Sequence, residues 1–247
     1  NKDMAARSSL TILFENPFWI GLYERIEGDK YEKSVLEILQ MNEYVNYLAE
    51  IIREKDSLQL VKSEADKYYK SHSLDDCFNM GIELYQSDNF QIQEVGIFLL
   101  GYSAHHNASA LSFLKDTVSQ HDSWKVQEVL AMAFDNHCKI IGYDVGLPLI
   151  KEWLNSDCAN VRRAVSEGLR IWTSRPYFRD NPQIAIQLLS AHREDASEYV
   201  RKSVGNALRD ISKKYPELIS AELNLWDLSS KEIKQVYKLA SKFLDSN

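Results

Sequence analysis

The chain has 247 residues, of which 45% are hydrophobic and 26% charged, a composition typical of a globular protein with a substantial core. Only 9 Gly and 5 Pro residues occur, which argues against turn-rich β architecture over most of the length. No apolar run approaches the roughly 18 residues of a membrane span, and the N-terminal residues lack a secretory pattern. We therefore expect a cytoplasmic protein that does not contact a membrane.

The charges are unevenly distributed along the sequence. The net charge is −7, yet residues 158–214 contain eleven Lys or Arg residues and six Asp or Glu residues. A basic segment in an acidic chain can attract an anionic partner, although a solvated helix surface would have the same composition. The three cysteines, Cys77, Cys138 and Cys158, are too widely spaced for a zinc knuckle or a disulfide framework. We expect free thiols, no metal and no other cofactor.

The first 32 residues differ from the rest of the chain. The run SLTILFENPFWIGLYERIEGDKYE mixes β-branched and aromatic residues and contains a Gly28-Asp29 turn signal, which suggests a small β-hairpin. Residues 9–32 also resemble the opening of a small family of uncharacterised bacterial proteins. We therefore divide the chain into an appended segment, 1–32, and a helical domain, 33–247.

From Glu32 onward, apolar residues recur at spacings of three and four, which predicts helices almost throughout. The expected helices are 33–54, 57–71, 74–86, 90–105, 108–120, 123–139, 143–155, 159–174, 182–193, 197–214, 216–226 and 229–245. Four serines at expected helix starts are candidate N-caps: Ser73, Ser123, Ser197 and Ser229. Three tryptophans fall at apolar-face spacing and are expected in the core: Trp153, Trp172 and Trp226.

Four of the expected helices repeat one another at spacings of 34, 35 and 39 residues. They read IQEVGIFLLGYSA from Ile92, VQEVLAMAFDNHC from Val126, VRRAVSEGLRIWT from Val161 and VRKSVGNALRDIS from Val200. Each forms a pair with the helix before it, and such a pair cannot cover its own apolar face, so neighbouring pairs must stack. The pattern resembles the HEAT repeat and predicts an all-α solenoid.

The third and seventh positions of these helices are expected to form a row along the concave surface. The row reads Glu94/Phe98, Glu128/Met132, Arg163/Glu167 and Lys202/Asn206, and so changes from acidic and apolar to basic and polar. Its basic half would suit a phosphate backbone, while an acidic peptide is an alternative ligand. Within the row, Glu167 lies within helical reach of Arg163 and Arg170, so a simple surface salt bridge also explains it.

The run NVRRAVSEGLR, followed by Trp172, Arg175-Pro176, Asp180-Asn181-Pro182 and SEYVRKSVGNALRDISKKYPEL, resembles the bacterial HEAT-like DNA alkylation repair family of alkylpurine glycosylases. Its similarity is greatest to the AlkC branch, and it extends over about residues 75–226. The resemblance implies metal-free hydrolysis of the N-glycosidic bond of cationic alkylated purines in damaged duplex DNA.

The same resemblance implies roles for individual residues. Glu167 would be the catalytic carboxylate, Glu128 a second carboxylate and Trp124 an aromatic residue beside the lesion. A carboxylate near the sugar would stabilise the developing oxocarbenium charge, and an aromatic ring would attract a cationic base. The predicted phosphate contacts are Arg162, Arg163, Arg201 and Lys202. Two alternative functions remain: a non-catalytic HEAT-like DNA-binding protein, and a HEAT-repeat scaffold for a protein partner.

Overall fold

A computed structural model describes residues 29–52 and 57–244 of the chain. The chain divides into two compact units, residues 1–53 and 54–247. In the first unit the described element is α3 (Asp29–Ile51). The β-hairpin expected near the N-terminus falls mainly on residues 1–28, which lie outside the described residues. The unit that holds the repeats begins at residue 54, whereas the helical domain was expected to begin at residue 33.

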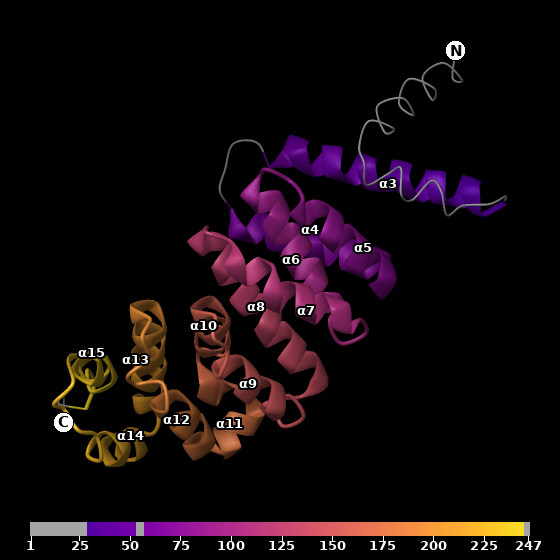
Figure 1. The fold of residues 1–247 in the computed structure, drawn as a ribbon. Helices are drawn as coiled ribbons and strands as arrows, with labels where there is room; N and C mark the ends of the chain where they lie inside the picture. The colour runs from indigo at the N-terminus through magenta and orange to yellow at the C-terminus, as the bar shows by residue number, and fades with distance from the viewer. Residues whose placement is uncertain (1–28, 53–56, 245–247) are drawn as a thin grey trace. The chain divides into compact units, whose positions relative to one another are not determined.

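The second unit is a solenoid of helix pairs, and its described residues contain helices and no β-strand. One layer consists of α4 (Leu58–Ser71), α6 (Phe90–Ser103), α8 (Trp124–Ile141), α10 (Ala159–Gly168), α13 (Glu198–Ser212) and α15 (Lys231–Ala240), and each of these helices packs against the next (Figure 1). We call this the inner layer. The outer layer consists of α5 (Leu74–Tyr85), α7 (Ala108–Asp116), α9 (Leu147–Leu154), α12 (Pro182–Ser190) and α14 (Pro216–Leu223). The expected all-α repeat fold is confirmed.

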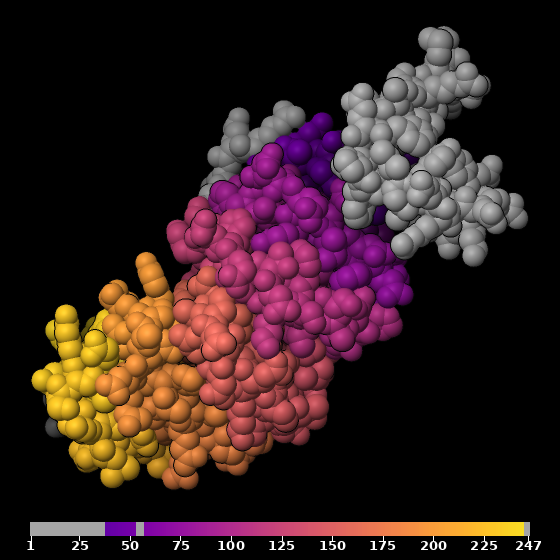
Figure 2. Space-filling view, in the orientation of Figure 1, coloured from indigo at the N-terminus to yellow at the C-terminus, as the bar shows by residue number. Residues whose placement is uncertain are grey.

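Residues close in sequence lie close in space throughout this unit. In the space-filling view, the colours from α4 to α15 follow one another in bands along the unit (Figure 2). Each pair therefore packs mainly against its sequence neighbours, as expected of a solenoid. Among the described residues, no helix is both long enough and apolar enough to cross a lipid bilayer.

Local signals explain where several helices begin. Ser73 caps α5 in a reciprocal capping box with Asp76, as the sequence predicted. Ser123 and Ser197 precede α8 and α13, but neither side chain makes a capping hydrogen bond. Before α15 the capping side chain belongs to Ser230, one residue after the predicted Ser229.

The core lies between the two layers. Trp153 and Trp172 are fully buried and Trp226 is nearly so, which confirms the core positions expected for all three. Trp153 packs on Phe134 with ring centroids 4.4 Å apart, and Trp172 packs on Phe178 at 5.0 Å. Large aromatic side chains thus fill the space between consecutive pairs.

The second position of each repeat has a common structural role. The side chains of Gln93, Gln127, Arg162 and Arg201 all donate to backbone carbonyl groups in the segment before their own helix. Arg162 Nη1 lies 2.8 Å from the oxygen of Ser156, and Arg201 Nη1 lies 2.7 Å from that of Asp195. Gln93 and Gln127 donate in the same way to the carbonyl groups of Tyr85, Val118 and His121. This position therefore attaches each of these four inner helices to the segment before it.

The expected length of the helix at 159–174 was wrong. The helix ends at Gly168, and a 3-10 turn (Trp172–Ser174) and the short helix α11 (Pro176–Asp180) follow it. Within the helix, Ser166 is fully buried and bonded to Ser203 of α13 at 2.9 Å. The reason is that α10 lies between α8 and α13, so both of its flanks are covered.

Candidate nucleic-acid groove

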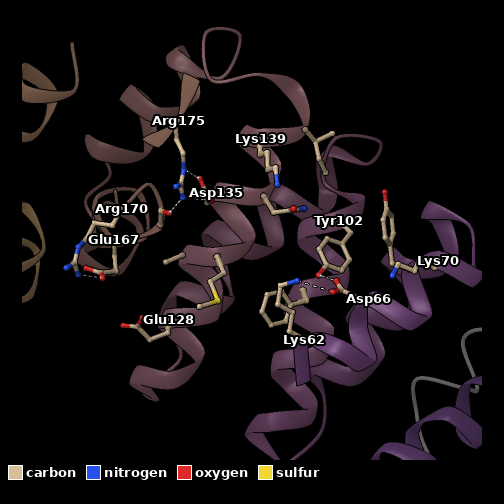
Figure 3. A pocket seen from close by; sticks show the side chains of 17 residues that line it. Lys62, Asp66, Lys70, Tyr102, Glu128, Asp135, Lys139, Glu167, Arg170 and Arg175 are labelled. Carbon is tan, nitrogen blue, oxygen red and sulfur yellow. Dashed lines mark hydrogen bonds and ion pairs between the residues drawn. The ribbon is translucent and has the colours of Figure 1, made fainter. Parts of the chain in front are cut away.

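A groove of about 820 Å³ runs along the inner layer, lined by α4, α6, α8, α10 and the segment after α10 (Figure 3). Its apolar lining includes Phe98, Met132 and Ile140. Its charged lining comprises five cations and four acids: Lys62, Lys70, Lys139, Arg170, Arg175, Asp66, Glu128, Asp135 and Glu167. We call this the concave groove.

Glu167 lies in the concave groove, but both of its carboxylate oxygens have partners. Oε1 accepts from Arg170 Nη1 at 2.7 Å, and Oε2 accepts from Ser203 Oγ at 2.9 Å. Arg170 in turn bonds Asp210 of α13 at 3.0 Å. Of the two arginines that could pair with Glu167, Arg170 does so, whereas Arg163 is paired with Glu128. Glu167 therefore joins α10 to α13 as well as facing the groove.

Glu128 also faces the groove and is less constrained. Its side chain is 32% exposed, against 20% for Glu167. Arg163 bonds Oε1 of Glu128, and Oε2 has no hydrogen-bond partner among the described residues. Of these two candidate carboxylates, Glu128 is the one that keeps an oxygen available to a ligand.

A third carboxylate in the groove, Asp135, was not among the site residues predicted from the sequence. Arg175 holds it in a two-pronged ion pair with distances of 3.1 and 2.7 Å, and Tyr143 donates to it at 2.9 Å. Asp135 lies seven residues after Glu128, two helical turns along the same face of α8. That spacing was visible in the sequence, whereas its pairing with a residue 40 positions away was not.

At the acidic end of the predicted row, Glu94 does not line the concave groove, and Phe98 lines it with only a small part of its surface. Glu94 and Phe98 are buried, with 3% and 2% of their surfaces exposed. Burial raises the pKa of the Glu94 carboxyl group from 4.5 to about 7. The expectation that the whole row points off the core was therefore wrong at this repeat, because α6 is packed on both flanks by α4 and α8.

The four cations predicted to contact phosphate lie in different environments. Arg162 makes a two-pronged pair with Asp195, at 2.7 and 2.8 Å. Arg201 donates to Gln235 and to loop carbonyl groups. Arg163 is half-buried in its pair with Glu128, and Lys202 is exposed beside Glu198 at 2.7 Å. The guanidinium groups of Arg162 and Arg201 are thus already bonded to other groups of the protein. The phosphate-contacting role of the four cations stays a prediction.

Trp124 begins α8, one turn before Glu128, and 68% of its surface is exposed. It lines a neighbouring cleft of about 630 Å³ rather than the concave groove itself. Arg163 lines the same cleft and pairs with Glu128 of the groove, so the two hollows share a wall. The structure thus places Trp124, Glu128 and Arg163 along one edge of the inner layer.

The fold and the groove define a helical-repeat solenoid with a charged concave face, and comparison with known proteins gives the family. Residues 57–224 match the profile of the DNA alkylation repair enzyme family, so the chain belongs to that family. The expected family resemblance is confirmed.

Three relatives illustrate the similarity. The crystal structure of AlkD2 from Streptococcus mutans is 50% identical, with a TM-score of 0.81, over 83% of this chain and 99% of that one. Pseudomonas fluorescens alkylpurine DNA glycosylase AlkC, solved with DNA containing an abasic site analogue, is 21% identical over 86% of this chain and 64% of that one, with a TM-score of 0.45. The uncharacterised protein YhaZ of Bacillus subtilis is 38% identical over 78 residues, which is 30% of this chain and 22% of that protein.

Proposed function

We propose that this chain binds alkylated DNA along the inner layer and hydrolyses the N-glycosidic bond of cationic alkylpurines, with Glu128 as the principal carboxylate. Membership of a DNA alkylation repair family supports the substrate class. Glu128 is chosen as the principal carboxylate because its Oε2 atom has no hydrogen-bond partner among the described residues and the side chain lines the concave groove. The exposed Trp124 lies one helical turn before it.

The proposed reaction requires mainly a carboxylate held at a fixed position near the sugar. An N3- or N7-alkylated purine is already cationic, so the bond from its nitrogen to the sugar breaks with the electron pair returning to the base. The sugar becomes oxocarbenium-like, and a fixed carboxylate stabilises that charge. Water adds to the sugar carbon and gives up one proton, which Glu128 can accept. Arg163 holds Glu128 through Oε1 and leaves Oε2 for this task.

Trp124 and Glu167 have secondary roles in this proposal. The exposed ring of Trp124 offers a π-face to a cationic base, an attraction of about 0.5–2 kcal/mol. Glu167 adds negative charge to the groove, but its two bonds to Arg170 and Ser203 keep it at the α10–α13 junction.

The test compares isosteric variants in an assay for release of 3-methyladenine and 7-methylguanine from methylated DNA. Glu128→Gln should lower the rate by about 10²- to 10³-fold, because it removes the charge and keeps the shape. Glu167→Gln should lower it less. Glu152→Gln, an exposed acid on the outer helix α9, is the matched control and should leave the rate unchanged. Equal rates for Glu128→Gln and wild type would refute the role of Glu128.

A non-catalytic DNA-binding function is the second candidate. It is favoured by the internal pairing of the groove acids, since Arg163, Arg170 and Arg175 each already neutralise one of them. In that case methylated DNA would bind without base release above the spontaneous rate. A protein scaffold would be indicated instead if binding to DNA were absent at low salt.

A further inference from the structure

Two exposed aromatic rings flank one cleft at the N-terminal edge of the inner layer. Tyr199 of α13 is 74% exposed and Trp124 of α8 is 68% exposed, more than any other large aromatic residue in the described part of the chain. Although they are 75 residues apart in sequence, both line the cleft of about 630 Å³ over the start of α10. Isolated exposed rings are common on protein surfaces, but two that line a single cleft indicate a binding surface.

The wall between the rings carries polar groups that can bond to a planar heterocycle. His121 accepts the backbone N–H of Ser123 at Nδ1, which leaves the N–H of a neutral ring at Nε2. Gln120 and Asn160 use their amide nitrogens on Ser119 and Cys158, so their carbonyl oxygens remain acceptors. None of these three remaining groups has a partner among the described residues. The cleft thus offers stacking faces and both kinds of hydrogen-bonding group.

The position of the cleft relates it to the concave groove. Arg163 stands in the shared wall, with its guanidinium group on Glu128 of the groove. The cleft therefore lies beside the concave groove, with the Arg163–Glu128 pair between them. A volume of about 630 Å³ falls within the range of about 300–1,000 Å³ usual for small-ligand sites, so it has room for a nucleotide.

We propose that the cleft between Trp124 and Tyr199 binds an unpaired nucleobase of a DNA strand held in the concave groove. This inference rests on the proposed DNA-binding function. In a perfect duplex both faces of each base are covered by its neighbours, so only an unpaired base can offer a face to these rings. Stacking on aromatic side chains tolerates every base, which fits a cleft without a set of charged groups for one particular base edge.

The test uses unmethylated, fluorescein-labelled DNA, so that it does not depend on base release. Three ligands share one sequence: a perfect duplex, the same duplex with a two-thymine bulge, and that bulged duplex with abasic analogues in place of both thymines. Wild type should bind the bulged duplex at least about five-fold more tightly than the perfect one. The abasic bulge should lose that preference, because it has the backbone flexibility without the bases.

Tyr199→Ala should remove most of the preference for the bulge, and Tyr199→Phe should retain it because the ring remains. Leu225→Ala changes an equally exposed apolar residue outside the cleft and should have no effect. Quenching of tryptophan fluorescence by the bulged duplex should disappear in Trp124→Phe, whether or not Tyr199 is intact.

The outcomes separate the two proposals. Equal affinity for perfect and bulged duplexes, or an undiminished preference in Tyr199→Ala, would refute the base-binding cleft while leaving duplex binding in place. Absence of binding to all three DNAs at low salt would overturn both the cleft and the proposed function. A preference shown equally by the thymine and abasic bulges would refute the cleft, because flexibility alone would explain it.

Discussion

Glu94 shows how burial at a single residue makes stability depend on pH. Its carboxyl group is buried without a hydrogen-bond partner among the described residues, and burial raises its pKa to about 7. The folded-state pKa therefore exceeds the unfolded-state value, so the folded form binds a proton more tightly. The stability associated with this protonation is fully present below about pH 4.5 and is lost as the pH rises through 7.

Glu94→Gln should therefore stabilise the protein at pH 8 by on the order of 2 kcal/mol and have little effect near pH 4.5. The measurement is the difference in thermal unfolding between variant and wild type at the two pH values. Glu152→Gln, an exposed control, should show no such change. A difference that is the same at both pH values would contradict the assignment.

Arg162 and Lys202 allow structural and surface cations to be compared directly. Arg162 neutralises Asp195, whose side chain is only 5% exposed, and also bonds the carbonyl groups of Ser156 and Asp157. Arg162→Ala should lower the free energy of unfolding by about 3 kcal/mol, because it removes the two-pronged partner of a carboxylate that is largely shielded from water. Lys202→Ala should leave the unfolding midpoint unchanged, since both members of its ion pair are exposed.

Chemical denaturation of the two single variants checks this prediction. If Arg162→Ala is as stable as Lys202→Ala, the two-pronged pair with Asp195 does not contribute as described. If it is less stable, Arg162 is unsuitable for testing phosphate contact, since lost binding would then reflect partial unfolding. Lys202 is the better choice for that purpose, because both members of its ion pair are exposed.

At the scale of the helix, the sequence predicted the repeat and most helix starts because those follow from local periodicity, whereas several helices end three to six residues before the predicted position. The spacing of the four related helices fixed the stacking, and the apolar positions fixed the core. A helical wheel, however, assumes that one face is buried. In α10 the flanks are also covered, so Ser166 and Arg162 are bonded to the neighbouring repeat rather than solvated.

The candidate site was predictable to the extent that it lies on a single helix. Trp124 and Glu128 are one turn apart on α8, and the resemblance to the repair family pointed to both. The pairing of Asp135 with Arg175, and of Glu128 with Arg163, depends on the register between repeats. That register is set by packing across 35 to 40 residues of sequence, which no local pattern records.

Gly168 at the end of α10 provides a test of that register. A Cβ atom at this position would clash with the carbonyl oxygen of Ala131 on α8. Gly168→Ala should therefore destabilise the protein by about 1–3 kcal/mol, although alanine normally favours a helix over glycine. Thermal unfolding measures the effect, and a rise in the midpoint would contradict the close approach of α8 and α10.

At the scale of the whole repeat unit, most of the charge on the inner layer serves to join one repeat to the next. The ion pairs Glu128–Arg163, Asp135–Arg175, Arg162–Asp195 and Arg170–Asp210 each connect residues 33 to 40 positions apart. Those pairs that involve groove residues hold the side chains in place, and each pair neutralises the charges of its two members. The concave groove, with five cations and four acids, therefore has a net charge of only +1.

This balance predicts weak DNA binding with a shallow dependence on salt. Of the groove cations, Lys70 and Lys139 make no ion pair with any described residue, so about two phosphates would be neutralised. Each neutralised phosphate contributes about −0.9 to the slope of log K against log salt, so we expect a slope near −2 rather than the roughly −5 to −9 of a protein that makes about 6–10 phosphate contacts. Lys70→Ala and Lys139→Ala should each flatten the slope by about one, because each removes one phosphate contact.

The control is Lys115→Ala, which changes a cation already paired with Glu152 on the outer layer and should leave the salt slope unchanged. Fluorescence anisotropy of a labelled duplex over a salt series gives these slopes. A wild-type slope steeper than about −6 would mean that the paired arginines exchange their carboxylate partners for phosphate when DNA binds.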